Sequence, residues 1–316
     1  MRRMGNRELL SRCNPMGNLH HTPVYLQRMI VFKAEITLFS GRDLFLFLES
    51  DMKIFVFDLD GTLLNKDHQL SSATLAAVQR AQTLGAMVIL ASGRTALAMQ
   101  PTYEALKLNT AMISYNGARI TYPSGHIIEQ RLTSQSIDLI SKIAEQRSVQ
   151  LNLYGNDLWY TTQPDSEEAI RYSKITGLTP TKVTLEQIPT LDIVKALYIA
   201  PPQTLEILQD DVIHALGDTV NITSSIYNFL EILPNHVHKG HALQILADHL
   251  QFSVDDVIAF GDGMNDLELL KVAGIGVAMD NANPALKEIA DAIAPHHDED
   301  GVAQYLNSIL DQLENA

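Results

Sequence analysis

The chain has 316 residues, 46% of them hydrophobic, which is enough for about two domains with hydrophobic cores. Its formal net charge of −14 argues against a nucleic-acid partner, because phosphate backbones are bound by patches of Lys and Arg. No run of about 18 apolar residues occurs, so we expect no membrane-spanning helix.

Residues 1–51 show no clear helical or strand periodicity, and the pattern becomes regular at Met52. The start of this segment is rich in Arg and poor in acids, as a targeting sequence would be, but it lacks amphipathic order. We therefore expect a disordered or wrongly assigned leader. It holds the one cysteine, Cys13, which excludes an intramolecular disulfide and a Cys-rich zinc site. A single cysteine fits a reducing compartment, and we predict a cytoplasmic protein.

Two carboxylates follow the first predicted strand. Ile54–Phe57 is an apolar run typical of a buried strand, and it leads directly into Asp58-Leu59-Asp60-Gly61-Thr62. The glycine lets the backbone turn and approach a ligand closely, so Asp58 and Asp60 can address one shared point. The alternative is an Asp-Gly hairpin turn. It is disfavoured because the next residues have helical rather than alternating spacing.

Helical and strand patterns alternate after this turn. We predict helices over 72–84 and 95–106 and strands over 87–91 and 111–114. This order implies a parallel sheet, which places ligands at the carboxyl ends of its strands. Ser92 follows one of these strands, so we expect it at the same sheet edge as Asp58.

The sequence pattern changes between about 132 and 235, where no acidic turn occurs. We predict an inserted α+β domain with helices near 134–147, 165–176 and 202–216 and strands near 150–154, 157–161, 194–199 and 226–233. Its aromatic residues Tyr154, Trp159 and Tyr160 are candidates for stacking on a substrate, although core packing is the commoner use.

A second acidic turn appears when the parallel pattern resumes. We predict a helix over 239–250, strands over 257–260 and 276–279, and a helix with Asn283 as its cap. The first of these strands ends in Gly261-Asp262-Gly263-Met264-Asn265-Asp266. Asp262 and Asp266 lie four residues apart, and a cation would relieve their repulsion. The alternative is a solvated loop with Asp266 as an N-cap.

Together these segments resemble the haloacid dehalogenase superfamily, specifically the Cof-type phosphatases of its subfamily IIB, from Met52 to the C-terminus. The first motif, D-x-D-G-T, is matched by 58–62, and the fourth, G-D-G-x-N-D, by 261–266. Ser92 matches the second motif, a strand-terminal Ser or Thr, and Lys239 the third, a Lys before Gly. Tyr115-Asn116-Gly117-Ala118 and Asp300-Gly301-Val302 also resemble the subfamily.

The resemblance implies an α/β fold with a Rossmann-like core and a parallel sheet, formed by 52–132 and 236–316. It places an inserted α+β cap of the C2B type at 133–235. It further implies a Mg²⁺-dependent phosphatase that forms an aspartyl-phosphate. The expected partner is a small phosphorylated metabolite, such as a sugar phosphate, a nucleotide or pyridoxal phosphate, and the protein would be a monomer or a small homo-oligomer.

The resemblance also implies roles for individual residues. Asp58 would be the nucleophile and Asp60 the general acid and base, with Lys239 neutralising charge. Mg²⁺ would bind Asp58, the Asp60 backbone carbonyl and Asp262, with Asp266 steadying this shell. The phosphoryl oxygens would be held by Gly61, Ser92, Gly93, Arg94, Lys239 and Asn265. For Arg94, a phosphate contact and an ion pair with an acid are equally open.

Other functions stay open at this point. A phosphomutase would form the same aspartyl-phosphate but return the phosphoryl group to its substrate, and a catalytically silent sugar-phosphate-binding module would keep the fold without turnover. Release of free phosphate separates the phosphatase from the phosphomutase, and absence of any turnover with metal present would indicate the silent module. A zinc site is disfavoured because no H-E-x-x-H motif and no cysteine partner accompany the clustered histidines, which are His236, His238, His241, His296 and His297.

Overall fold

The structure, a computed structural model, describes residues 53–224 and 228–314. All of them belong to one compact unit of the chain. The expected leader at 1–51, with Cys13, lies outside the described residues, as does Met52.

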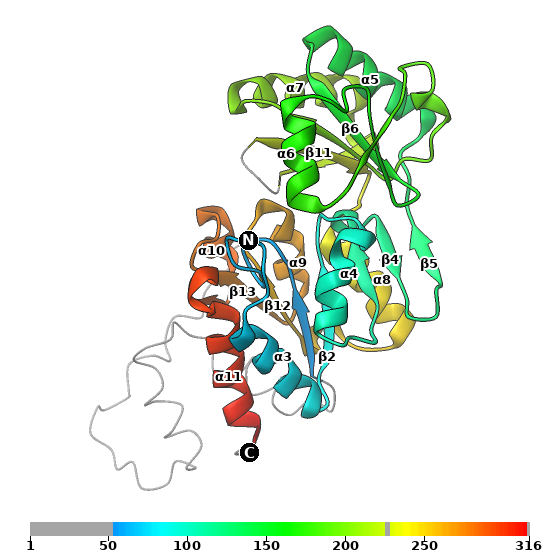
Figure 1. Cartoon of the computed structure of the whole chain (residues 1–316). Coiled ribbons are helices and arrows are strands. Elements are labelled where there is room, and N and C mark those ends of the chain that lie inside the picture. The colour runs from blue at the N-terminus through cyan, green and yellow to red at the C-terminus, as the bar shows by residue number, and fades with distance from the viewer. Residues whose placement is uncertain (1–52, 225–227, 315–316) are drawn as a thin grey trace, which may run out of the picture. The chain divides into compact units, whose positions relative to one another are not determined.

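An eight-stranded sheet carries the predicted parallel pattern, in the order β14-β13-β12-β1-β2-β3-β4-β5 (Figure 1). The strands from β14 to β3 pair in parallel, which confirms the prediction. β4 and β5 extend one edge as an antiparallel hairpin, which the sequence did not predict because three-residue strands are too short to show a period. The bounds are β1 Ile54–Phe57, β2 Met87–Ala91, β3 Met112–Ser114, β4 Arg119–Thr121, β5 Ile127–Glu129, β12 Val257–Gly261, β13 Ile275–Met279 and β14 Ala292–Ala294.

Helices cover both faces of this sheet, as its continuous apolar strands require. In β1, Ile54 and Val56 belong to the core cluster that includes residues of α8 and α9. On the other face, Phe57 stacks on Phe260 with ring centroids 4.9 Å apart, and Phe260 contacts Tyr305 of α11 at 5.6 Å. The helix bounds are α3 Ser72–Thr83, α4 Ala96–Ala105, α8 Lys239–Leu250, α9 Leu267–Val272, α10 Pro284–Ile289 and α11 Gly301–Glu314, with short 3-10 turns η1 Tyr115–Gly117, η4 Val254–Asp256, η5 Met264–Asp266 and η6 His297–Glu299.

Side-chain caps set where the helices begin. Thr95 Oγ1 accepts a hydrogen bond from the amide of Ala98 at 3.0 Å, immediately after the loop that leaves β2. Asn283 Oδ1 accepts from the amide of Ala285 at 3.0 Å, with Pro284 as the first residue of α10, as predicted. Such caps satisfy amides that have no partner within the helix. They also fix the lengths of the loops at the carboxyl edge of the sheet.

A second sheet, of six strands, lies within residues 150–234 in the order β10-β11-β9-β6-β7-β8. Only β7 and β8 pair in parallel, so this segment has the predicted α+β character. Helices α5 and α7 contribute to the core cluster on one face, and Tyr172 of α6 packs against Trp159 and Phe229 on the other. The bounds are β6 Gln150–Gly155, β7 Leu158–Thr161, β8 Pro180–Lys182, β9 Lys195–Ile199, β10 Val220–Thr223, β11 Phe229–Pro234, α5 Ser134–Arg147, α6 Glu167–Thr176, α7 Pro202–Leu216, η2 Ile188–Thr190 and η3 Gly217–Thr219.

Tyr154, Trp159 and Tyr160 are buried in this second sheet, with 0%, 1% and 8% exposure. They pack in the core, the commoner of the two uses considered for them.

Among the helices of residues 53–224 and 228–314, none combines the length and apolarity needed to cross a bilayer.

Candidate active site

The carboxyl end of β1 presents the first acidic pair. The parallel pairing with β12 continues one residue beyond β1, since the amide of Asp58 donates to the carbonyl of Phe260 at 3.0 Å. The chain then turns at Gly61, whose φ of +81° suits glycine, and a Cβ there would lie 2.3 Å from Asp262 Oδ2. The turn leads on to α3 rather than to an antiparallel partner strand, so the hairpin alternative is wrong.

The second acidic segment folds around the carboxylate of Asp266. Its Oδ2 accepts hydrogen bonds from the amides of Asp262 and Gly263, both at 3.0 Å. A Cβ on Gly261 would lie 2.5 Å from the Cβ of Asp266, so glycine is required for this tight turn. Asp262 Oδ1 in turn accepts from Thr62 Oγ1 at 2.8 Å. Asp266 is fully buried, so the solvated-loop alternative is wrong.

Lys239 joins the two acidic segments. It is the first residue of α8, and its side chain is fully buried. Its Nζ lies 2.5 Å from Asp58 Oδ1 and 2.6 Å from Asp266 Oδ1. Burial alone would lower the pKa of Lys239, but the two carboxylates outweigh burial and raise that pKa above its ordinary value. The ammonium group is therefore charged and linked to both halves of the site.

Asp58, Asp262 and Asp266 form a group that could hold a metal ion. One carboxylate oxygen from each lies within 4.8 Å of the others. Burial raises the pKa of Asp58 well above its ordinary value, against the opposing charge of Lys239. Burial and the nearby Asp266 carboxylate raise the pKa of Asp262 to about 7. Crowded acids in a poorly solvated site favour a cation, and hard carboxylate oxygens suit Mg²⁺, so the donor set fits that ion.

The side chain of Asp60 has different partners from those three acids. Arg94 donates to its carboxylate, from Nε to Oδ2 at 2.6 Å and from Nη2 to Oδ1 at 2.5 Å. His68 Nδ1 lies 2.8 Å from the same Oδ1. Burial would raise the pKa of Asp60, but the hydrogen bonds from His68 and Arg94 outweigh it and lower that pKa well below its ordinary value. Of the two uses considered for Arg94, the structure contains the ion pair. His68 was missed because nothing in its local sequence distinguishes it from a solvated histidine.

Ser92, Gly93 and Arg94 form the loop that leaves β2. The amide of Arg94 donates to Ser92 Oγ at 3.2 Å. Gly93 packs against Asn116 of η1, where a Cβ on the glycine would lie 2.9 Å from Asn116 Oδ1. The same oxygen accepts from Asn265 Nδ2 at 2.9 Å, so Asn116 links this loop to the second acidic segment. Asn116 was noted in the sequence only as part of a family-like segment, without this contact.

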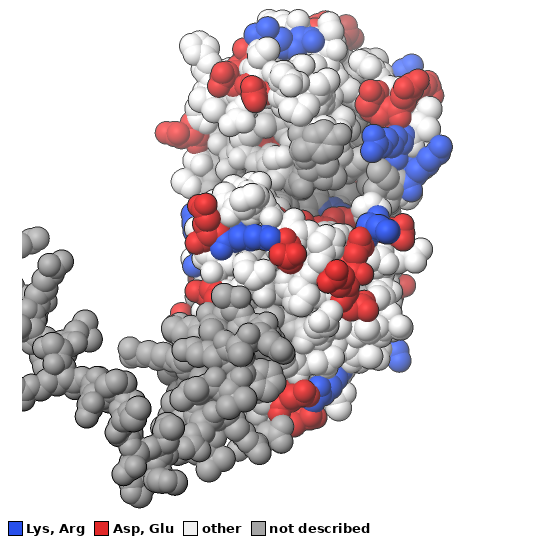
Figure 2. Space-filling model, turned by 90° about the vertical axis from the view of Figure 1, so that its left-hand side faces the viewer, with Lys and Arg blue, Asp and Glu red and all other residues white. Residues whose placement is uncertain are grey.

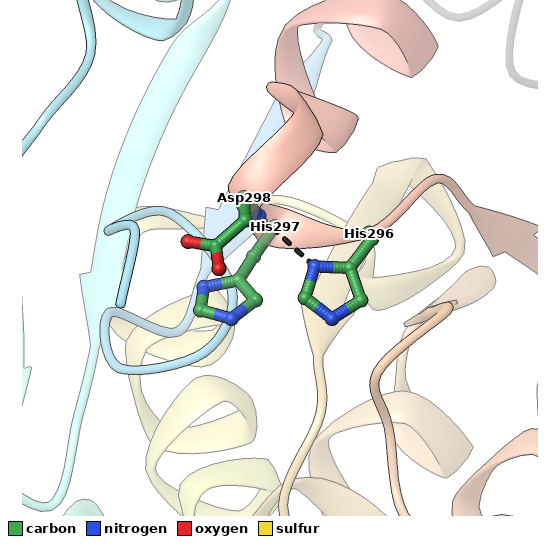
Figure 3. Close-up of side chains that lie close together, drawn as sticks. All are labelled: His296, His297 and Asp298. Carbon is green, nitrogen blue, oxygen red and sulfur yellow. Dashed lines mark hydrogen bonds between the residues drawn. The ribbon is translucent and has the colours of Figure 1, made fainter. Parts of the chain in front are cut away.

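His296, His297 and Asp298 form another group with metal-ligating side chains (Figure 3). His296 Nδ1 accepts a hydrogen bond from the amide of Asp298 at 3.1 Å, so the neutral ring carries its proton on Nε2. His297 Nδ1 lies 2.8 Å from the carbonyl of Leu64, and Asp298 Oδ1 accepts from the amide of Lys66 at 2.8 Å. His297 and Asp298 therefore hold this segment against the loop that follows β1. That the histidines bind no zinc stays a prediction from the sequence.

The charged side chains on one face of the molecule are interspersed. On the face drawn in Figure 2, Lys and Arg stand singly or in small groups among Asp and Glu. Among the described residues drawn there, no broad positive surface of the kind that binds nucleic-acid backbones is present.

Comparison with known proteins gives consistent relatives. A family model described as haloacid dehalogenase-like hydrolase matches residues 55–306. The HMP-PP phosphatase of Cronobacter sakazakii is 33% identical over 262 residues, covering 82% of this chain and 96% of that protein. The HMP-PP phosphatase of Yersinia enterocolitica is 31% identical over 261 residues, covering 82% of this chain and 95% of that protein.

Solved structures agree with these relatives. A haloacid dehalogenase-like hydrolase from Bacteroides thetaiotaomicron superposes with a TM-score of 0.75 at 28% identity, covering 82% of this chain and 100% of that one. The subclass IIB sugar phosphatase BT4131 superposes with a TM-score of 0.73 at 21% identity, covering 81% of this chain and 98% of that one. The second likeness concerns the fold alone, and it confirms the architecture expected from the subfamily IIB resemblance.

Proposed function

The chain belongs to the haloacid dehalogenase-like hydrolases and is a phosphatase, and from this premise we propose that it hydrolyses phosphate monoesters of small metabolites with Mg²⁺. The observation that carries the proposal is the meeting of Asp58, Asp262 and Asp266 around buried Lys239. The name of these relatives makes HMP-PP the first substrate to test. A cytoplasmic location and a monomeric or small homo-oligomeric state stay predictions.

Charge neutralisation is the first requirement of the reaction. A phosphate dianion repels an attacking carboxylate, so positive charge must surround Asp58 before it can approach phosphorus. Lys239 already lies against Asp58 Oδ1 and leaves Oδ2 outside that ion pair. Mg²⁺, held by Asp58, Asp262 and the Asp60 carbonyl with Asp266 behind them, would supply further neutralisation. Asp58 then attacks in line with the departing oxygen to give an aspartyl-phosphate.

Asp60 would protonate the leaving oxygen and later accept the proton of the attacking water. While Arg94 and His68 hold its carboxylate, the low pKa opposes the first of these steps. We therefore propose that phosphoryl oxygens compete for Arg94 when substrate binds. Loss of the Arg94 contact would raise the pKa of Asp60 and prepare it to act as an acid. Both sequence-based uses of Arg94 would then occur, at different stages of the cycle.

The remaining predicted residues would hold the equatorial oxygens of the phosphoryl group. Ser92 would use its hydroxyl, Gly61 and Gly93 their amides, and Asn265 its side-chain amide. These are positioning contacts, and each well-aimed donor typically lowers a barrier of this kind by about 3 kcal/mol.

A phosphate-release screen with Mg²⁺ tests the proposal. The substrates are HMP-PP, sugar phosphates, nucleotides and pyridoxal phosphate, and each is assayed again with EDTA. We expect Mg²⁺-dependent release of inorganic phosphate from at least one of these substrates. Isomerisation of a sugar phosphate without free phosphate would instead identify a phosphomutase, and binding without turnover would identify a silent module.

A further inference from the structure

All three backbone carbonyls of the Ser92–Gly93–Arg94 loop accept hydrogen bonds. The amide of Asn116 donates to Ser92 O and the amide of Tyr115 to Arg94 O, both at 2.9 Å. The central carbonyl, that of Gly93, accepts from Lys195 Nζ at 2.7 Å. The two outer donors belong to η1, next to the first sheet, whereas the central donor comes from β9 of the second sheet. A residue of the inserted segment therefore supplies the third of the hydrogen bonds to this loop's carbonyls.

Lys195 is enclosed by groups that stabilise its charge. Its side chain is 3% exposed, and Nζ lies 2.9 Å from Oε1 of Glu231, which is equally buried. The ring of Tyr154 lies beneath the ammonium, 5.0 Å from Nζ to the centroid. Burying such an ion pair costs desolvation energy that the attraction between the charges often does not repay, so the pair is weak evidence of a purely stabilising role. The proposed chemistry above assigns no role to either charged residue.

Glu231 extends this contact to the second acidic segment. Its Oε2 accepts from Asn116 Nδ2, and Asn116 Oδ1 accepts from Asn265 Nδ2 at 2.9 Å. Asn116 has φ +54°, the left-handed conformation that asparagine tolerates, and this is part of the turn that aims its amide at both neighbours. One ion pair of the second sheet thus reaches both loops that are expected to hold the phosphoryl group.

Planarity of the peptide bond transmits this contact to a site residue. The Gly93 carbonyl and the Arg94 amide belong to one planar unit, so fixing the oxygen also fixes the direction of the N–H. That N–H donates to Ser92 Oγ at 3.2 Å. Lys195 therefore sets the orientation of the Ser92 hydroxyl through a single rigid peptide.

We propose that Lys195 and Glu231 are positioning residues that align Ser92 and Asn265 with the phosphoryl group. The inference rests on the proposed function for the location of the phosphoryl group. It goes beyond that function by making the inserted segment part of the phosphate-binding apparatus, in addition to any contact that the segment makes with the leaving group. Because the phosphoryl group is common to all substrates, loss of the pair should affect every ester equally.

The test uses the full chain with both charges replaced together, as Lys195→Met with Glu231→Gln. This avoids a lone buried charge, and the glutamine oxygen can still accept from Asn116. Arg147→Met with Asp211→Asn is the control for charge removal in the same segment, because it removes a more exposed ion pair, 2.7 Å long between α5 and α7. The probes are p-nitrophenyl phosphate and a sugar phosphate with Mg²⁺, inhibition by inorganic phosphate, and thermal unfolding.

We expect the Lys195/Glu231 variant to lose about 10- to 100-fold in kcat on both esters, and its inhibition by inorganic phosphate to weaken in parallel. The control should keep wild-type kcat and phosphate inhibition. Wild-type values in the folded Lys195/Glu231 variant would overturn the proposal. So would a loss that differs between the two esters while phosphate inhibition is unchanged, since it would assign the pair to the leaving group.

A second neutral variant keeps the test decisive if this double replacement does not fold. Lys195→Gln with Glu231→Gln leaves no charge at either position and keeps a polar group at both, but the shorter side chain at position 195 holds the Gly93 carbonyl less closely than the lysine does. We expect a smaller loss of kcat, about 3- to 10-fold, with the same independence of the leaving group. If the wild type hydrolyses none of the esters, the proposed function fails. Calorimetric binding of inorganic phosphate with Mg²⁺ then tests the positioning role by itself, and equal affinity in wild type and variant overturns it.

Discussion

The two sheets bring polar groups to the candidate site in different ways. In the parallel sheet, β1 and β12 run side by side and both end in glycine-containing acidic turns, so strand ends alone gather Asp58, Asp262 and Asp266. In the second sheet, neighbouring strands mostly run in opposite directions, so their ends lie at both edges. Its contribution is Lys195, the first residue of β9, and Glu231, within β11. The two lie on one face of the sheet, because Glu231 pairs with Leu197, two residues from Lys195. A parallel sheet concentrates chemistry at one edge, whereas an antiparallel sheet offers it from a face.

The same contrast appears in the two buried lysines. Lys239 contacts two carboxylates, each from a different acidic turn. Lys195 contacts one carboxylate and one backbone carbonyl. We therefore expect Lys239 to be needed for charge balance and chemistry, and Lys195 to be needed for the alignment of the phosphate-binding loop.

Asp58→Asn should have the largest effect on turnover. The amide cannot form the aspartyl-phosphate, so we expect phosphate release with Mg²⁺ to fall by at least about 10³-fold. Asp138→Asn is the control, because it removes an exposed carboxylate of α5 that pairs only with Lys142 among the ion pairs of the described residues. It should keep wild-type turnover. Near-native activity of Asp58→Asn would rule out the covalent step.

Lys239→Met should combine loss of activity with loss of stability. The change leaves Asp58 and Asp266 buried without their shared cation, and breaking a buried ion pair in this way typically costs about 3–5 kcal/mol. Urea unfolding without metal measures the loss, and added Mg²⁺ should recover part of it. Lys195→Met leaves one buried carboxylate, that of Glu231, without its cation. It should therefore lower the free energy of unfolding by less. If Lys195→Met destabilised the protein more than Lys239→Met, the proposed difference between the two lysines would be wrong.

Gly61→Ala should weaken the metal site and turnover together. The new Cβ would lie 2.3 Å from Asp262 Oδ2, at a φ of +81°. We expect about a 10- to 100-fold higher Mg²⁺ requirement, measured by titrating activity with Mg²⁺. Gly85→Ala is a closely matched control, because Gly85 has φ +86° and nothing within 4 Å of its added Cβ. It carries the same backbone cost of about 1–2 kcal/mol without the clash. Equal Mg²⁺ titrations for the two variants would contradict the proposed role of Asp262.

The smallest expected effect is a shift in the pH dependence of stability. The pKa of Asp262 rises from 3.8 to about 7 on folding, so between these values the folded protein binds more protons than the unfolded chain. This contribution makes the metal-free protein less stable as pH increases across that window. Asp262→Asn removes it, and we expect a higher melting midpoint than wild type at about pH 8 without metal.

Mg²⁺ and a second carboxylate provide the controls for that measurement. Mg²⁺ should raise the wild-type midpoint more at about pH 8 than at about pH 5, and should have little effect on Asp262→Asn. The carboxylate of Asp298 should have the opposite effect on stability as pH rises, because a hydrogen bond from the Lys66 amide lowers its pKa. Asp298→Asn should therefore lower the midpoint at neutral pH. A midpoint for Asp262→Asn below that of wild type at about pH 8 would show that folding does not raise the pKa of Asp262.

Much of the fold and the central acids were predictable because they depend on neighbours in sequence. Apolar runs at β1 and β12 predict buried strands, and the glycines beside Asp60 and Asp262 predict turns at their ends. The cap at Asn283 follows the same local logic. The hairpin of β4 and β5 was not predictable, since its three-residue strands are too short to carry a period.

The sequence by itself determined which strands end in acids and, through the parallel order, that those ends meet. Tertiary structure alone decided the partners of the charged groups, such as Asp60 for Arg94. It also decided that Lys195 reaches Gly93 across 102 residues and that Glu231 reaches Asn116 across 115. The physical reason is that periodicity and turn chemistry arise from local backbone geometry. A buried ion pair depends instead on how two separately formed sheets are packed and on which charges that packing removes from water.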